Sequence, residues 1–161
     1  MLPDLPLSQR KRDIFFIVAF AFFAFSSFYS DACYALLGLE GDAGCVQANR
    51  TYVELAGDDL FATQPGFMRV RTGLSAFVYG PFYLVLIWAF VSGADWIRLP
   101  ALLYAGSMVL GVFEHLLWEY ALGQPPRHPG VFFAFTLPYL VVPLLLAARM
   151  WQPRPFGARA A

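Results

Sequence analysis

Two carboxylates lie within apolar stretches of the sequence, where an acid is energetically costly. Asp31 ends a stretch rich in Phe and Ala, and Glu114 lies beside His115 near the end of the apolar run 96–120. A carboxylate at membrane depth costs a few kcal/mol on insertion scales, so we expect it to face the protein interior or a wet cavity. Such a group can bind a polar or cationic part of a ligand, or it can donate a proton when burial favours its neutral form.

Helical spacing groups further polar residues with these two acids. Ser27 lies one turn before Asp31, and Ser107, Gly111 and Glu114 share one face of a helix. We expect these groups to line one intramembrane pocket, with Asp31 and Glu114 as the catalytic pair if the protein is an enzyme. The full candidate ligand-binding set is Ser27, Asp31, Thr72, Ser75, Tyr79, Ser107, Gly111, Glu114, His115, Thr136 and Tyr139.

The composition indicates a membrane protein with several spanning segments. Hydrophobic residues make up 59% of the chain and charged residues 14%, against about 45–50% and about 25% in soluble domains. The formal net charge is zero and the longest basic run is the triplet 10–12, so nothing favours nucleic-acid binding. The bilayer is therefore the expected environment.

The hydrophobic pattern predicts an all-α fold, a four-transmembrane-helix bundle, because four apolar segments are long enough to cross a bilayer. They cover about 14–30, 72–92, 96–120 and 131–148. We divide the chain into an N-terminal segment (1–12), a four-helix membrane domain (13–150) and a disordered basic tail (151–161).

The long connection between the first two spans holds a short amphipathic helix near 46–55 and both cysteines, Cys33 and Cys45. The cysteine spacing matches no metal site, and the sequence leaves open whether they form a disulfide or stay free thiols.

Arginine and lysine bias places both termini in the cytoplasm, in a bacterial inner membrane or a eukaryotic endoplasmic reticulum. In this orientation Asp31, Thr72, Glu114 and Thr136 all fall in the exoplasmic half of the bundle. Each of four separate segments therefore places a polar residue at the same depth, which predicts a shared chamber in the exoplasmic half of the bundle.

Several short motifs resemble the EXPERA domain family over about residues 14–150. Trp96-Ile97-Arg98-Leu99-Pro100 and the run 138–143, PYLVVP, are similar to the sigma-2 receptor branch. Tyr79-Gly80-Pro81 and His128-Pro129 are more similar to emopamil-binding protein, the sterol Δ8–Δ7 isomerase of the same family.

The resemblance implies a bundle with cytoplasmic ends that is often dimeric and binds sterols and amphiphilic amines in a pocket reached from the bilayer. Asp31 matches the acid that ends the family's first helix, and Asp58 or Asp59 matches an acid in the following loop. The isomerase's histidine falls at Ser27. Its second-helix glutamate falls near Thr72 and Ser75, and its fourth-helix asparagine falls near Thr136. A second carboxylate would then come from Glu114, on a different helix.

Three functions follow from these observations. The first is binding of a sterol- or isoprenoid-like lipid by Asp31 and Glu114. The alternative is an isomerase or cyclase that protonates a sterol or terpenoid alkene, and a second alternative is a scaffold or lipid-trafficking partner, with a homodimer as a further expectation. No hydrolase elbow, phosphate-binding glycine loop or metal-ligand cluster occurs in the sequence, so we expect no cofactor and no metal.

Overall fold

The computed structural model describes residues 7–156, and in that part of the chain the regular structure is all helix, with no strand. Four helical stretches are long and apolar enough to cross a membrane, which confirms the expected all-α, four-span fold. These stretches are Lys11–Leu37, Gly66–Ser92, Asp95–Leu122 and Pro129–Met150.

Each span is built from more than one helical segment. Span one contains α1 (Lys11–Ser26), η2 (Ser27–Asp31) and α2 (Ala32–Leu37), and span two contains α5 (Gly66–Leu74), η3 (Ser75–Tyr79) and α6 (Gly80–Ser92). Span three contains η4 (Asp95–Ile97), α7 (Arg98–Leu117) and η5 (Trp118–Leu122), and span four contains α8 (Pro129–Thr136) and α9 (Pro138–Met150). A short turn, η1 (Leu7–Gln9), precedes span one, and α3 (Gly44–Ala56) and α4 (Asp59–Thr63) lie between spans one and two.

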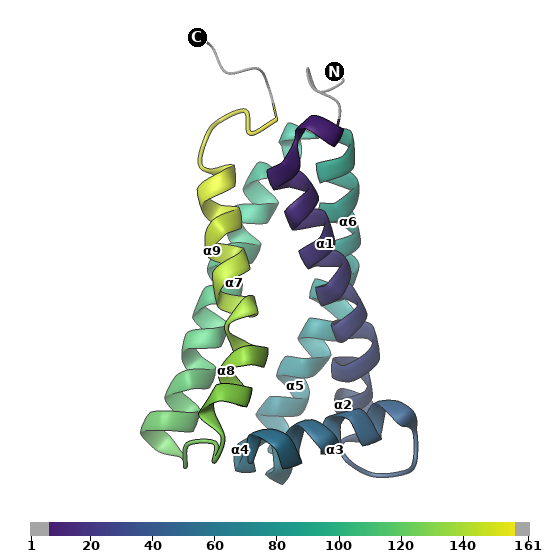
Figure 1. Ribbon diagram of the computed structural model, residues 1–161, viewed down its shortest axis with the longest axis vertical. Coiled ribbons are helices and arrows are strands. Elements are labelled where there is room, and N and C mark those ends of the chain that lie inside the picture. The colour runs from purple at the N-terminus through teal and green to yellow at the C-terminus, as the bar shows by residue number, and fades with distance from the viewer. Residues whose placement is uncertain (1–6, 157–161) are drawn as a thin grey trace.

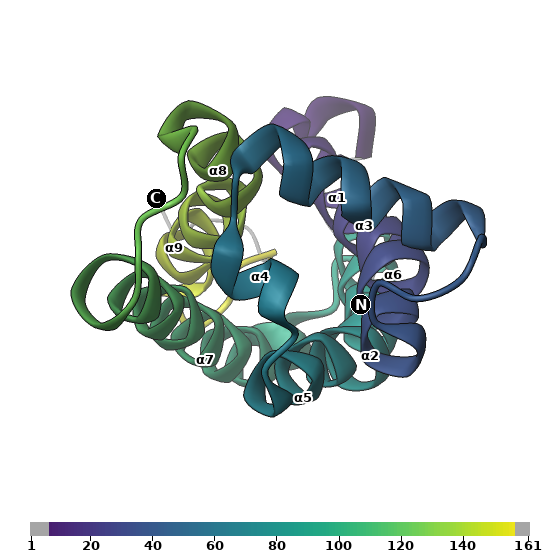
Figure 2. The same cartoon turned by 90° about the horizontal axis from the view of Figure 1, so that it is seen from below.

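The four spans form two helix pairs that diverge along the molecule. Helix α1 packs on α6, and α7 packs on α9. Figure 1 shows the pairs close together where the described chain begins and ends, and further apart at the other end, where α3 and α4 lie across the bundle. Seen from below in Figure 2, α3 and α4 cover that wider end. We call α3 and α4 the cap.

An aromatic core holds the narrow half of the bundle together. Phe20 is fully buried and stacks on Tyr83, with their ring centroids 6.1 Å apart, and Phe90 meets Phe16 at 5.2 Å. Lipid tails are as apolar as these side chains, so helix association here depends on close packing rather than on escape from water. Large flat rings supply that contact area.

The cap is tied to the end of span one. A disulfide joins Cys33 of α2 to Cys45 of α3, which settles the question that the sequence left open. Ser30 Oγ donates to Asn49 Oδ1 at 2.6 Å, and Asn49 Nδ2 donates back to the Ser30 carbonyl at 3.1 Å. The amphipathic helix expected near 46–55 is confirmed as α3.

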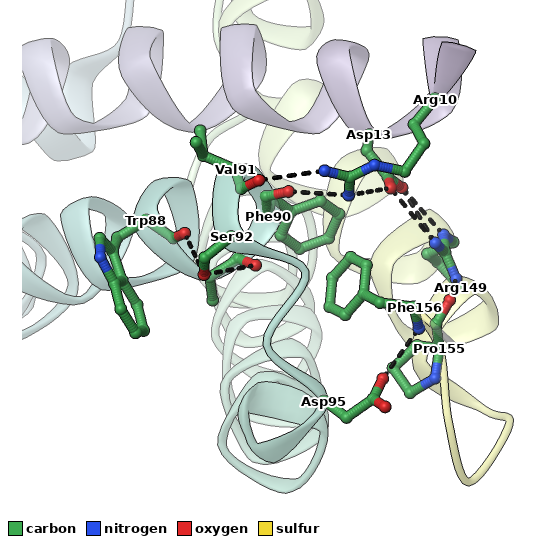
Figure 3. Close-up of polar contacts among 11 residues, drawn as sticks. Arg10, Asp13, Trp88, Phe90, Val91, Ser92, Asp95, Arg149, Pro155 and Phe156 are labelled. Carbon is green, nitrogen blue, oxygen red and sulfur yellow. Dashed lines mark hydrogen bonds and ion pairs between the residues drawn. The ribbon is translucent and has the colours of Figure 1, made fainter. Parts of the chain in front are cut away.

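A buried ion-pair cluster closes the narrow end of the bundle (Figure 3). Asp13 is 1% exposed, and its carboxylate accepts from Arg10 Nη1 at 2.9 Å and from Arg149 Nε at 3.1 Å. Arg10 also donates to the carbonyls of Phe90 and Val91 at 2.9 and 3.0 Å. These three charged residues, Arg10, Asp13 and Arg149, which we call the clasp, therefore join spans one, two and four.

The segment after span four continues across this end of the molecule. Phe156 packs into the aromatic core, and its backbone N–H donates to Asp95 Oδ1 at 2.9 Å. The expected disorder of the basic tail concerns in part residues 157–161, which lie outside the described residues, and it stays a prediction.

The clasp leads to a stability prediction. Asp13→Asn leaves two arginines without their counter-charge, and breaking a buried ion pair is strongly destabilising, so we expect a loss of about 3 kcal/mol in the free energy of unfolding. Denaturant titration of the purified protein in a mild detergent measures this loss. Asp42→Asn, an exposed acid in the loop before α3, is the matched control and should change stability by less than about 0.5 kcal/mol. An equal effect of the two substitutions would contradict the role given to the clasp.

Candidate functional site

Three of the four spans contain a π-helical turn toward the wider half of the bundle. These turns are η2, η3 and η5. A π-helical turn widens the helix by one residue, and such turns are frequent at functional sites. Here they carry Asp31, Ser75 and Glu119, so the polar residues of the membrane segments coincide with the irregular parts of their helices.

The first polar centre, the Asp31 site, lies where η2 packs against η3. The Ser27 and Ser75 hydroxyl oxygens are 3.0 Å apart, and the Asp31 side chain lies beside Ser75. Asp31 is half-buried, and within residues 7–156 no lysine or arginine forms an ion pair with it. The site thus offers an acceptor without a protein counter-charge.

Tyrosines surround the Asp31 site on the side of the aromatic core. The Tyr104 hydroxyl donates to the Tyr83 hydroxyl at 3.2 Å, and the Tyr79 hydroxyl donates to Ser107 Oγ at 3.2 Å. Tyr139, whose ring stacks on Phe23 at 4.4 Å, lies near Asp31, as does Tyr83. Flat apolar rings with hydroxyl edges suit a ligand that is mostly hydrocarbon with one polar end.

A second polar centre joins the cap to span three; the sequence analysis named His115 and, through the family resemblance, Asp58 or Asp59, but it did not name Glu119 or group the three residues. One side-chain atom each of Asp58, His115 and Glu119, a carboxylate oxygen or an imidazole nitrogen, lies within 4.8 Å of the other two. We call these three residues the acid–histidine cluster. Asp58 and Glu119 are both fully buried, and His115 Nε2 is 3.9 Å from Glu119 Oε1.

Within this cluster, Asp58 has hydrogen-bond partners, whereas Glu119 and the Nδ1 atom of His115 have none. Asp58 caps α4 by accepting from the Phe61 N–H at 2.7 Å, and it accepts from the Tyr52 hydroxyl at 2.8 Å. Burial and the neighbouring Asp58 carboxylate raise the pKa of the Tyr52 phenol, so Tyr52 keeps its proton and remains a donor. In contrast, both carboxylate oxygens of Glu119 and the Nδ1 atom of His115 are buried without a hydrogen-bond partner.

Glu114 does not face the interior as the sequence analysis expected. Its side chain is exposed on the surface of α7, near Arg71, whose guanidinium donates to the Gly111 carbonyl at 2.7 Å. Among the described residues, no hydrogen bond or ion pair joins Glu114 to Asp31. The carboxylate that span three buries is Glu119, because the bundle presents that face of the helix to the cap.

The other residues of the predicted set fall into two groups. Ser27, Ser75 and Tyr139 lie at or next to the Asp31 site, whereas Tyr79 and Ser107 form a hydrogen bond with each other. The Thr72 hydroxyl instead donates to the Met68 carbonyl of its own helix at 3.0 Å, and Thr136 is half-buried near the end of α8. The functional role of the whole set remains a prediction.

A separate apolar groove of about 460 Å³ lies between α7 and α9. Its lining includes Ala105, Gly106, Val109 and Leu144, and none of the candidate ligand-binding residues lines it.

Comparison with known proteins finds a family and a curated relative that match this chain. The sequence profile of the EXPERA (EXPanded EBP superfamily) family matches residues 45–150. Sigma intracellular receptor 2 of Xenopus tropicalis is 29% identical over 112 residues, which cover 60% of this chain and 63% of the relative. The match thus spans less than two thirds of the length of that curated relative. No solved structure matches the chain.

The Tyr52–Asp58 contact gives a prediction for the cap. Tyr52→Phe removes a hydrogen bond to a carboxylate, so we expect the free energy of unfolding to fall by about 2 kcal/mol, within the range for bonds to charged groups. Thermal or denaturant unfolding in detergent measures the change. Tyr29→Phe alters an exposed tyrosine of η2 in the same way and should be nearly neutral. A neutral Tyr52→Phe would show that the phenol does not hold Asp58 in place.

Proposed function

The chain belongs to the EXPERA family, and from this premise we propose that it is an integral membrane receptor for a sterol- or isoprenoid-like lipid or amphiphilic amine. The ligand would lie between the two helix pairs, with its polar or cationic end at Asp31. The Xenopus tropicalis relative is by name a receptor, which agrees with a binding role.

One observation carries the proposal, namely a half-buried carboxylate without a protein cation. Asp13 at the other end of span one is held by two arginines, whereas within residues 7–156 Asp31 has the Ser75 hydroxyl beside it and no arginine or lysine partner. An ionised carboxylate removed from water needs a partner, and a ligand ammonium or hydroxyl group can provide one. The tyrosine rings would contact the hydrocarbon body.

Binding is favoured over catalysis by the position of Glu114. Protonation of an alkene followed by loss of a proton needs two suitably placed groups, and the second carboxylate of the isomerase hypothesis was Glu114. Because that side chain is exposed on the surface of α7, the two-carboxylate mechanism receives no support from geometry. A scaffold role without a ligand would leave the unpaired Asp31 unexplained.

We further propose that both termini are cytoplasmic and the cap is exoplasmic. The Cys33–Cys45 disulfide lies at the cap, and disulfides persist in oxidising compartments such as the periplasm or the endoplasmic reticulum lumen. This agrees with the arginine and lysine bias of the sequence. Homodimer formation, which the family resemblance suggests, stays part of the proposal.

The ligand-binding proposal predicts a charge-selective loss of affinity. In Asp31→Asn, binding of a labelled steroidal tertiary amine should weaken about 30-fold, because removing one partner of a desolvated charge pair costs about 2 kcal/mol or more. Binding of an uncharged sterol of the same shape should weaken much less. Equilibrium binding to the protein in lipid nanodiscs provides both affinities.

Glu54→Gln, a change at an exposed acid of α3, is the control and should bind both probes as the unmodified chain does. Mass spectrometry of lipids that co-purify with each variant identifies natural ligands in parallel. If neither probe binds, or if Asp31→Asn binds the amine with unchanged affinity, the proposed site is wrong.

The orientation predicts the state of the two thiols. In intact cells or sealed vesicles, a large maleimide reagent should add to Cys33 and Cys45 only after reduction, and the chain contains no other cysteine that would react. A mass shift of two adducts after reduction, and none before it, is expected on a denaturing gel. Modification of both thiols without reductant would contradict an exoplasmic, oxidised cap.

A further inference from the structure

The acid–histidine cluster contains more negative charge than the surrounding protein balances. Asp58 and Glu119 are both fully buried, and within residues 7–156 neither pairs with an arginine or lysine. The nearest described ion pair on the cap, Arg127 to Asp59 at 3.3 Å, is exposed and involves the neighbouring acid. Two buried carboxylates in contact require a cation or a shared proton between them.

The donor atoms are the right kind and nearly the right distance apart for a transition metal. Imidazole nitrogen and carboxylate oxygen both bind Zn²⁺ at about 2.0–2.2 Å, so two ligand atoms of a tetrahedral ion lie about 3.4 Å apart. The ligand atoms here lie within 4.8 Å of one another, so binding an ion needs side-chain shifts of up to about 1.4 Å. His115 and Glu119 are one helical turn apart on span three, a spacing that puts two ligands on one face.

The unpartnered atoms are an independent sign of a missing ligand. Glu119 is fully buried, yet neither of its oxygens accepts a hydrogen bond. His115 Nδ1 is likewise buried and unpaired. Asp58, by contrast, is oriented by Tyr52 and the Phe61 N–H, as metal-ligating carboxylates are oriented by groups behind them.

We propose that Asp58, His115 and Glu119 bind one divalent transition-metal ion, of the zinc class, between the cap and span three. Two carboxylates and a neutral imidazole balance the charge of such an ion, which leaves the buried cluster neutral. Three protein ligands leave a fourth position for water. The ion would fix α4 against the end of span three. This inference is independent of the lipid site at Asp31.

Metal titration of the full chain tests the proposal. The protein, purified in detergent and treated with a chelator, is titrated with Zn²⁺ by calorimetry and with Co²⁺ by visible absorption. One ion per chain is expected, and Co²⁺ should give the intense visible bands of a four-coordinate site. Glu119→Gln and His115→Gln should each weaken Zn²⁺ binding more than about 100-fold, beyond what loss of an outer partner costs.

Matched controls use residues of the same type outside the cluster. His128→Gln and Asp59→Asn change exposed groups at the same end of the molecule and should bind Zn²⁺ with unchanged affinity. If the cluster variants do not fold, X-ray absorption at the zinc edge of the unmodified protein still decides, because it should report one imidazole with oxygen ligands and no sulfur.

Three results would overturn the proposal: absence of stoichiometric binding, equal binding by Glu119→Gln and His128→Gln, or a zinc coordination shell without imidazole. The first would mean that the two carboxylates share a proton instead, and the other two would mean that zinc binds at a different place. None of these results would affect the binding of lipid probes at Asp31, so the two proposals fail separately.

Discussion

The cost of burying a carboxylate away from water governs how this molecule is organised. At the narrow end, Asp13 is paired with Arg10 and Arg149, so its charge joins three spans and contributes to stability. At the wide end, Asp31 is half-buried and Glu119 fully buried, and within residues 7–156 neither pairs with an arginine or lysine. A chain that retains such groups either loses stability or stabilises them with something it binds. The same chemical group therefore serves structure at one end and is available for recognition at the other.

The shape of the bundle follows from this division. Aromatic packing and the clasp hold the helix pairs together near the described chain ends, and the pairs diverge toward the cap (Figure 1). Because lipid offers no hydrophobic force for closing the wide end, the spacing there is set by the cap and by the irregular turns η2, η3 and η5. Polar residues can then lie inside the bundle without being forced into direct packing.

Sequence reasoning could predict the four spans and the cap helix, because hydropathy and helical spacing report them directly. It could not choose between Glu114 and Glu119. Five residues along a helix is a rotation of roughly 140° from the starting face, so one acid faces inward when the other faces outward. In a membrane both directions are apolar, and composition does not distinguish them. The family resemblance pointed to Asp58 or Asp59 without choosing between them, since the burial of Asp58 depends on how the cap folds back over span three.

The cap is attached covalently to span one and by non-covalent contacts to the segment before span four. On the side of span one it is covalently attached through Cys33 and Cys45. On the side of span four it is held by backbone bonds from Arg127 and His128 and by an exposed ion pair to Asp59, a kind of contact worth at most about 1 kcal/mol. Local opening of the cap is therefore expected to start beside span four, while the disulfide keeps α3 attached to α2.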